Sequence, residues 1–154
     1  MPSEILIRPA TAADLEAVSE LLRSARLVPI DDTAQFGDQY AVAAAVDGTI
    51  VGMAGYERYG TDILLRSVTV DEKWRSVGIG HRLSLDRLEH ASVRGCTTAY
   101  LLTDTAAEYW KRHGFVQIDR SAAPVAISHS REWSAICPAS AIAMRRHLPS
   151  CTAC

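Results

Sequence analysis

Apolar residues recur along this chain at two spacings, and each spacing predicts a different element. Four of them fall at the three- and four-residue intervals of one helix face near the N-terminus: Leu15, Val18, Leu22 and Ala25. Thr11 stands before this set and Asp14 follows it by three residues, which is a variant of the capping box that begins helices. A short apolar run over residues 4–8, stopped by Pro9, predicts a strand ahead of the helix.

Three runs rich in β-branched and apolar residues come next, and they cover residues 40–46, 49–58 and 62–70. Asp47-Gly48 lies between the first two runs and is a strong signal for a two-residue hairpin turn. Gly60 ends the second run, so the third begins immediately after it. We therefore expect three strands in an antiparallel meander.

The second half of the chain alternates between helical and strand patterns. A helix is expected after residue 80, and the later elements are a strand at 97–103, a helix at 105–112, a strand at 115–118, a helix at 124–131 and a strand at 141–146. No repeat or linker divides the chain. The prediction is therefore one α/β (α+β) domain over residues 1–148, with a central mixed, mostly antiparallel sheet flanked by helices, and a flexible tail over 149–154.

Composition and charge narrow the functional classes. With 154 residues and a net charge of −2, the chain has no basic excess of the kind that nucleic-acid-binding proteins carry. No apolar run is long enough to cross a bilayer, and no basic segment precedes an apolar core at the N-terminus, so we expect a cytoplasmic protein without a membrane partner. The four cysteines are expected to be reduced thiols and to form no metal site: Cys96, Cys137, Cys151 and Cys154.

Residues 74–83 join a strand to a helix through a glycine-bearing turn, and this arrangement predicts an anion site. Amide N–H groups at a helix N-terminus point outward, and the helix dipole adds partial positive charge there. Gly78 and Gly80 allow the backbone to approach a phosphate closely, and Arg75 can add a charge-assisted hydrogen bond. Neither the dinucleotide-binding nor the P-loop glycine motif is present. A phosphate or pyrophosphate ligand is expected.

The pattern Arg-x-x-Gly-x-Gly, from Arg75 to Gly80, resembles the acetyl-CoA pyrophosphate loop of the GNAT superfamily of N-acetyltransferases. The segment Ala106-x-x-Tyr-Trp-x-x-x-Gly114-Phe115 resembles a second family feature, a helix that runs into a strand. The order of predicted elements is also similar to the GNAT fold. This resemblance implies a GNAT-like sheet and an acyltransferase that uses acetyl-CoA as co-substrate.

The resemblance also implies which residues hold acetyl-CoA. Backbone groups of Val68, Thr69 and Val70 would pair with the pantetheine arm, as a strand adds to an open sheet edge. The pyrophosphate would bind to the loop residues: Arg75, Ser76, Val77, Gly78, Ile79 and Gly80.

A narrower resemblance is carried by residues 101–106, by residues 128–133 and by Cys137-Pro138-x-Ser140-Ala141. These segments are similar to the arsenic-resistance N-acetyltransferases, the ArsN-type branch of the superfamily. This resemblance implies acetyl transfer to a primary amine of a small molecule, such as an amino acid or an organoarsenical or phosphinic amino-acid analogue.

One departure from the family affects the proton-transfer residues. The position of the family's general acid holds Trp110, whose indole N–H has no useful acidity. Its neighbour Tyr109 is the candidate acid, and core packing is the alternative role for that side chain. Glu57 is the candidate general base, although an exposed charge at a strand end is the favoured interpretation of this residue, and a base acting through water would also suffice.

An acidic acceptor would need guanidinium groups, which match oxyanions in a two-pronged geometry. Arg66 is the first candidate, because it shares a face with Val68 and Val70 if the strand alternates regularly. Arg131 is the second, and a surface ion pair is the alternative for each arginine.

Other functions stay open at this point. The chain could be an acetyl-CoA- or arsenic-binding module without turnover, or it could acetylate a protein or peptide. An acyl-enzyme on Cys137 is a rival chemistry without a readable His-Asp arrangement around it. An exposed sheet edge in the C-terminal half would be a natural contact for a homodimer.

Overall fold

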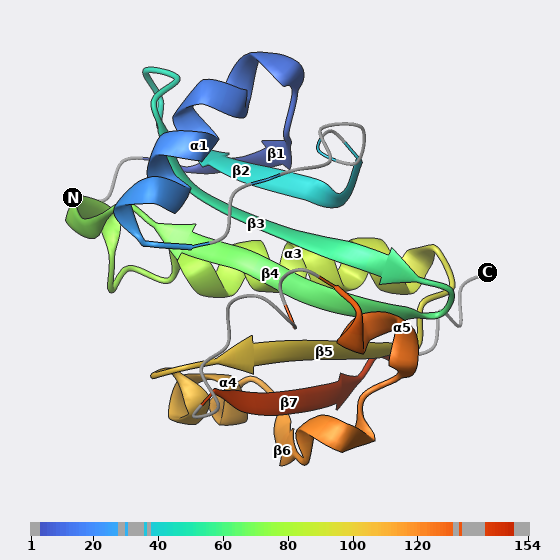
Figure 1. The fold of residues 1–154 in the computed structure, drawn as a ribbon. Coiled ribbons are helices and arrows are strands. Elements are labelled where there is room, and N and C mark those ends of the chain that lie inside the picture. The colour runs from blue at the N-terminus through green and yellow to red at the C-terminus, as the bar shows by residue number, and fades with distance from the viewer. Residues whose placement is uncertain are drawn as a thin grey trace. The chain divides into compact units, whose positions relative to one another are not determined.

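The computed structural model describes residues 4–27, 30, 36, 38–130, 133 and 141–149. Its strands form a seven-stranded sheet in the order β1-β2-β3-β4-β5-β7-β6 (Figure 1). The pairs β1-β2, β2-β3, β5-β7 and β6-β7 are antiparallel, and β4-β5 is parallel. The predicted fold class, a mixed and mostly antiparallel sheet with helices, is confirmed.

The predicted elements are present in the part of the chain that the structure describes. The strands are β1 (Leu6–Pro9), β2 (Tyr40–Ala44), β3 (Ile50–Tyr59), β4 (Asp62–Val70), β5 (Thr98–Thr103), β6 (Val116–Ile118) and β7 (Ile142–His147). The helices are α1 (Leu15–Ser24), α3 (Ile79–Val93), α4 (Ala107–Arg112) and α5 (Val125–Ser128). Single 3-10 turns, which the sequence did not predict, occur at Ala12–Asp14, Glu72–Trp74 and Arg120–Ala122.

The chain divides into two compact units. The first unit is Met1–Glu57 with Ser67–Glu89, and the second unit is Arg58–Arg66 with His90–Cys154. Strands β3 and β4 and helix α3 each continue from one unit into the other. Neither unit is therefore a continuous stretch of sequence.

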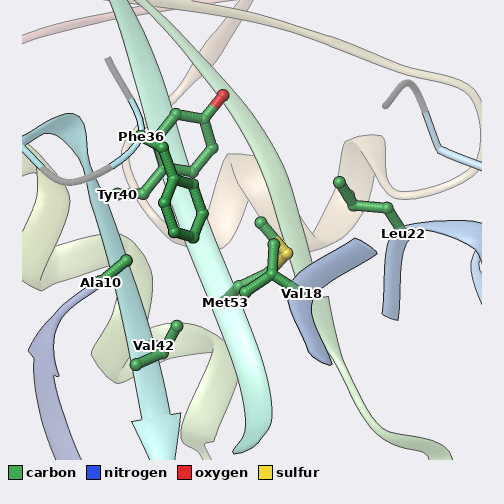
Figure 2. Close-up of a cluster of buried hydrophobic side chains, with 7 residues drawn as sticks. All are labelled: Ala10, Val18, Leu22, Phe36, Tyr40, Val42 and Met53. Carbon is green, nitrogen blue, oxygen red and sulfur yellow. The ribbon is translucent and has the colours of Figure 1, made fainter. Parts of the chain in front are cut away.

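In the first unit, α1 packs on β2 and β3 through a buried cluster (Figure 2), whose members are Ala10, Val18, Leu22, Phe36, Tyr40, Val42 and Met53. Val18 and Leu22 lie on the predicted apolar face of α1, and both are buried. At the helix start, Asp14 accepts hydrogen bonds from the backbone N–H of Thr11 at 2.8 Å and from its hydroxyl at 3.1 Å. The predicted capping arrangement is thus confirmed.

A glycine makes room for an aromatic ring in the same cluster. Gly55 lies opposite Tyr40 in the register of β2 and β3. A Cβ on Gly55 would stand 2.2 Å from ring carbons of Tyr40. The ring of Tyr40 also packs on Phe36, with 5.5 Å between ring centroids. The Tyr40 side chain therefore covers the glycine and cannot be moved without disturbing the cluster.

A second cluster in the first unit seats the start of α3 on the sheet, and its buried members are Ala41, Ala43, Val51, Ala54, Ile79 and Leu83. A Cβ on Gly52 would lie 3.0 Å from the Leu83 side chain and 3.2 Å from the Thr69 carbonyl oxygen. The absence of a side chain at Gly52 thus permits the close approach of α3.

The turn between β2 and β3 differs from the predicted two-residue hairpin. The Gly48 N–H donates to the Ala45 carbonyl at 2.9 Å, and the Ala45 N–H donates to the Thr49 carbonyl at 2.8 Å. Val46 and Asp47 are therefore the central residues of the turn, and Gly48 follows with a φ of 89°. The loop between the paired residues Ala45 and Thr49 therefore contains three residues instead of the predicted two, and the third is a glycine in the left-handed conformation.

In the second unit, β5 and β7 run side by side (Figure 1) in unbroken register from Thr98↔His147 to Thr103↔Ile142. Strand β6 continues the sheet on the other side of β7. A buried cluster covers one face: Leu64, Tyr100, Ile127, Trp133 and Ala143. The helix predicted over 124–131 is shorter than expected, because α5 ends at Ser128, and Arg131 and Pro138 lie outside the described residues.

Several other predictions concern the C-terminal part and the cysteines. Pro149 begins the predicted tail, and its carbonyl accepts a hydrogen bond from the Ser92 hydroxyl at 2.6 Å; the rest of the tail lies outside the described residues. Cys96 is buried, as expected of a core residue, while the other cysteines also lie outside that part of the chain. Of the described helices, none has the length and apolar character required to span a membrane.

Candidate functional site

The segment after β4 turns sharply before α3 begins. The Asp71 carboxylate accepts a hydrogen bond from the Lys73 N–H at 2.9 Å, which starts the 3-10 turn Glu72–Trp74. Ser76 and Gly78 then adopt φ angles of 68° and 87°. Nothing lies within 4 Å of the point where a Cβ on Gly78 would stand. Gly78 therefore supplies a backbone conformation that disfavours other residues, and it leaves the surface open.

Five consecutive N–H groups at the head of α3, those of residues 76–80, have no acceptor among the described residues. The N–H of Arg82 is already part of the helical ladder, donating to the Gly78 carbonyl at 3.1 Å. Residues 75–78 are exposed to solvent. N–H groups without acceptors at the positive end of a helix dipole are suited to bind an anion, so these residues are a candidate anion site.

Two hydrogen bonds fix the geometry of this loop. The Nε of Arg75 donates to the Val70 carbonyl at 2.9 Å, which ties the start of the loop to the last residue of β4. The Ser84 hydroxyl donates to the Gly80 carbonyl at 2.9 Å, within the first turns of α3. Ile79, the first residue of α3, is buried, whereas residues 75–78 before it are exposed.

Strand β4 is irregular where the candidate pantetheine and acceptor residues lie. Ser67 has a φ of 59°, in the left-handed region that serine seldom adopts. Regular alternation of side chains therefore does not extend from Arg66 to Val68. The expectation that Arg66 shares one face with Val68 and Val70 depended on that alternation, so it no longer follows. Val68 and Val70 pack against the α3 cluster of the first unit. Arg66 is 7% exposed and already interacts with another group of the protein.

The parallel pairing of β4 with β5 ends early. It runs from Asp62↔Thr98 to Leu64↔Tyr100, whereas β5 continues along β7 as far as Thr103. The main chain of Arg66 is thus outside the β4–β5 ladder. A strand that leaves its ladder exposes donors and acceptors that an extended ligand can use.

The two adjacent aromatic residues of helix α4, Tyr109 and Trp110, differ in their burial. Trp110 is buried and packs edge-on against Phe115, with 5.5 Å between ring centroids. Tyr109 is half-buried and lies against His113, with 4.4 Å between centroids. Burial raises the pKa of the Tyr109 phenol, and the nearby Arg112 opposes this shift only in part. The phenol is therefore protonated at neutral pH, the form that a general acid requires.

The remaining candidate residues are distributed between the units. Val68, Thr69, Val70 and the loop belong to the first unit, as does Glu57, which is half-buried on β3 and interacts with another group. Arg66 and Tyr109 belong to the second unit. Arg131 lies outside the described residues.

An open groove of about 870 Å³ borders the loop within the first unit, and no sequence pattern indicated it. Val77, Ile79 and Arg82 form one wall, and the ends of β1 and the β2–β3 hairpin form the other. Leu6 and Val46 on that second wall are 62% and 76% exposed. Such a groove arises from strands and a helix that are distant in sequence, which explains why no local pattern indicated it.

A mixed sheet whose fourth strand leads through an exposed loop into a helix places the chain among the α/β proteins. Residues 37–117 match the family described as acetyltransferase (GNAT) domain. The chain belongs to this family, whose members use acetyl-CoA as acetyl donor. A search of curated protein sequences found no match.

Solved structures share the fold at low sequence identity. N-acetylglutamate synthase from Neisseria gonorrhoeae, complexed with coenzyme A and N-acetyl-glutamate, is 15% identical with a TM-score of 0.81, over 97% of this chain and 36% of that chain. Rv2747 from Mycobacterium tuberculosis, in complex with CoA, is 20% identical with a TM-score of 0.79, over 94% of this chain and 99% of that chain.

A third similar structure is the ribosomal-protein-S18-alanine N-acetyltransferase from Escherichia coli. It is 17% identical with a TM-score of 0.69, over 94% of each chain. The chain thus spans about a third of the synthase and nearly the whole of the other two proteins. At these identities the likeness concerns the fold.

Proposed function

We propose that this protein transfers acetyl from acetyl-CoA directly to a primary amine of a small molecule. The observation that carries the proposal is the row of unpaired N–H groups over residues 76–80, on an exposed loop at the head of α3. A pyrophosphate has the oxygens and the charge to satisfy these donors. The open surface at Gly78 fits its close approach to the backbone.

The proposed binding mode uses β4 and the loop together. Val68, Thr69 and Val70 provide main-chain groups for the pantetheine arm, and the end of the β4–β5 ladder at Leu64 supports this role. Arg75 is held beside the loop by its bond to Val70, and its remaining N–H donors serve the phosphates.

In the proposed reaction, the amine nitrogen attacks the thioester carbonyl carbon and the carbon–sulfur bond breaks. The amine loses a proton to Glu57, directly or through water, and Tyr109 donates its phenol proton to the departing thiolate. The raised pKa of Tyr109 supports this role, since the phenol remains protonated until it is needed. Holding amine and thioester together supplies much of the acceleration.

For the acceptor we propose an acidic amine, either an amino acid or an organoarsenical or phosphinic analogue of one. The buried guanidinium of Arg66, two residues before Val68 on β4, supports an anionic group on the substrate. The similarity of residues 101–106 and 128–133 to the ArsN-type enzymes supports the arsenical. N-acetylglutamate in the complex of the Neisseria gonorrhoeae synthase supports the amino acid.

The test is release of free CoA thiol from acetyl-CoA by the purified protein with a panel of amines. The panel contains amino acids, their amides, phosphinic and arsenical glutamate analogues, and a peptide amine. We expect release with the small acidic amines. Acetyl-CoA binding without release by any amine would instead identify a binding module, a function that the buried tryptophan in the place of the family's acid also fits.

A further inference from the structure

An arginine on β7 has a buried hydrogen-bond donor that finds no acceptor in the part of the chain that the structure describes. The Nε of Arg145 is buried, and it has no hydrogen-bond partner among the described residues. By contrast, Arg146 donates to the His113 carbonyl at 3.0 Å, and Arg120 donates to the Trp133 carbonyl at 2.8 Å. Leaving a charged donor buried without an acceptor is costly, so its presence indicates a ligand for that donor.

The strand register places Arg145 within the buried face of the second unit. Tyr100 on β5 lies directly opposite Arg145, and Leu64 on β4 lies opposite Tyr100. Ala143, two residues before Arg145 on the same strand, belongs to the same apolar cluster as Leu64 and Tyr100. Directly opposed residues and residues two apart share a sheet face, so Arg145 lies beside this apolar cluster. Two residues further along the strands the same face carries polar residues: Asp62, Thr98 and His147.

A second arginine, itself buried, lies on the same face. Arg66 follows Leu64 by two residues and precedes the irregularity at Ser67, so it shares the face of Leu64. Only β5 separates β4 from β7, which puts their backbones about 10 Å apart at Leu64, the last paired residue of β4 and two residues before Arg66. Side chains of Arg66 and Arg145 can therefore reach the same small molecule from its two sides. Arg66 already interacts with another group, whereas the Nε of Arg145 lacks a partner in the described part of the chain.

We infer that Arg145 binds a carboxylate of the acceptor, with its Nε and one terminal nitrogen donating to the two oxygens. This inference rests on the proposed function, because the ligand is an acceptor only if acetyl is transferred to it. The binding itself does not require turnover. A carboxylate matches the planar fork of an arginine, and the apolar surroundings strengthen the pair by excluding water. A neutral ligand would leave the cation without a counter-charge, so the site selects acids over their amides.

Two variants test the inference: Arg145→Met removes the charge at similar length, and Arg145→Lys keeps the charge without the fork. Binding of L-glutamate, its phosphinic analogue and glutamate diamide, which has no carboxylate, is measured by titration calorimetry, independently of catalysis. KM for each amine and for acetyl-CoA is measured wherever thiol release occurs. We expect Arg145→Met to weaken carboxylate binding at least tenfold and to leave the matched amide and acetyl-CoA within twofold. Arg145→Lys should fall between Arg145→Met and the wild type.

The matched control is Arg146→Met, which removes the neighbouring cation on the opposite face of β7. It should leave the discrimination between acid and amide intact, and thermal melts identify any variant that is simply unfolded. Equal weakening of acid and amide by Arg145→Met would overturn the inference, as would a change in oligomeric state without a change in acid binding. Failure of the wild type to bind any acid of the panel would overturn it too. If the protein binds acids selectively but releases no thiol with any amine, the proposed function is contradicted and the carboxylate site at Arg145 is still supported.

Discussion

At the scale of single residues, Gly78 combines a left-handed backbone with an open position in the loop before α3. Its φ of 87° requires glycine, and the space around it is open. The substitution Gly78→Glu should therefore abolish acetyl-CoA binding, because it puts a negative charge beside N–H groups that await an anion. Fluorescence or calorimetric titration with acetyl-CoA measures the loss.

The control for Gly78→Glu is Gly60→Glu, at a glycine with a φ of 65° and equally open surroundings in the β3–β4 turn. Both changes strain the backbone in the same way, but only one adds charge to the loop. Wild-type affinity in Gly78→Glu would contradict the assignment of the loop.

Arg66 on β4 is predicted to contribute to the binding of an acidic acceptor. Arg66→Ala should raise KM for an acidic acceptor by about ten- to a hundredfold, roughly the effect of losing one charged contact. KM for acetyl-CoA should change little. A loss of acetyl-CoA affinity instead, or no change with any acid, would make Arg66 a structural residue.

Tyr109 is predicted to act through its phenol proton. Tyr109→Phe should lower kcat by about a hundredfold while KM for acetyl-CoA stays unchanged. Since an acid works in its protonated form and the pKa of Tyr109 is raised above its usual value of 10.0, the alkaline fall of kcat due to this group should lie above that pH. The fall should be missing in the variant.

Its neighbour supplies the comparison for the Tyr109 experiment. Trp110→Phe changes a buried packing residue, so it should lower the melting temperature with kcat largely kept. An unchanged kcat in Tyr109→Phe, together with a lower melting temperature, would show that Tyr109 is a packing residue as well.

At the scale of elements, α1 is joined to β1 by a titratable contact. The Arg8 guanidinium donates to both oxygens of Asp14 at 2.8 and 2.9 Å. These bonds, more than the Thr11 N–H and hydroxyl, lower the pKa of Asp14 to about 2, against an opposing effect of burial. A folded-state pKa below the unfolded one stabilises the protein above the unfolded value, and this contribution is lost as the pH falls from about 4 to about 2.

The measurement for this contact is urea unfolding of wild type and Asp14→Asn at pH 7 and pH 3. We expect Asp14→Asn to cost about 1–2 kcal/mol at pH 7 and distinctly less at pH 3. Arg8→Met should cost little more when it is added to Asp14→Asn, because the shared interaction is already gone. An equal cost at both pH values would rule out the charged contact as its source.

The pairing of β2 with β3 depends on Gly55 beneath the Tyr40 ring. Gly55→Ala should destabilise the fold by about 1–3 kcal/mol, since its methyl group would overlap a ring held by Phe36. Adding Tyr40→Leu should recover part of this loss, which a double-mutant cycle of unfolding free energies measures. Additive costs would mean that the ring moves aside freely.

The accuracy of the sequence predictions depends on where each element's signal comes from. Helix α1 was predicted with its cap because Val18, Leu22 and the Thr11–Asp14 pair are local signals. The left-handed Ser67 was not predicted, because a serine in an apolar strand carries no mark of positive φ. The extra residue of the hairpin turn was missed because Asp47-Gly48 suits two turn geometries.

At the scale of the whole molecule, the same distinction separates the loop before α3 from the surroundings of Arg145. The glycine turn and the helix start could be predicted because they are consecutive in sequence. The environment of Arg145 could not, since it depends on register between strands β4, β5 and β7, which are far apart in the chain. If Arg145 binds the acceptor as proposed, acceptor specificity depends on such long-range pairing, and a loop motif alone leaves it open.

The division into two units limits how this protein can be truncated or recombined. The chain passes between the units after Glu57, after Arg66 and after Glu89. Trimming the gene from either end therefore always removes part of both units before one is isolated. A fragment ending at residue 89 would contain the anion loop and only a nine-residue share of the second unit, namely Arg58–Arg66. Recombination that exchanges acceptor preference while keeping the loop must replace two separate gene segments together.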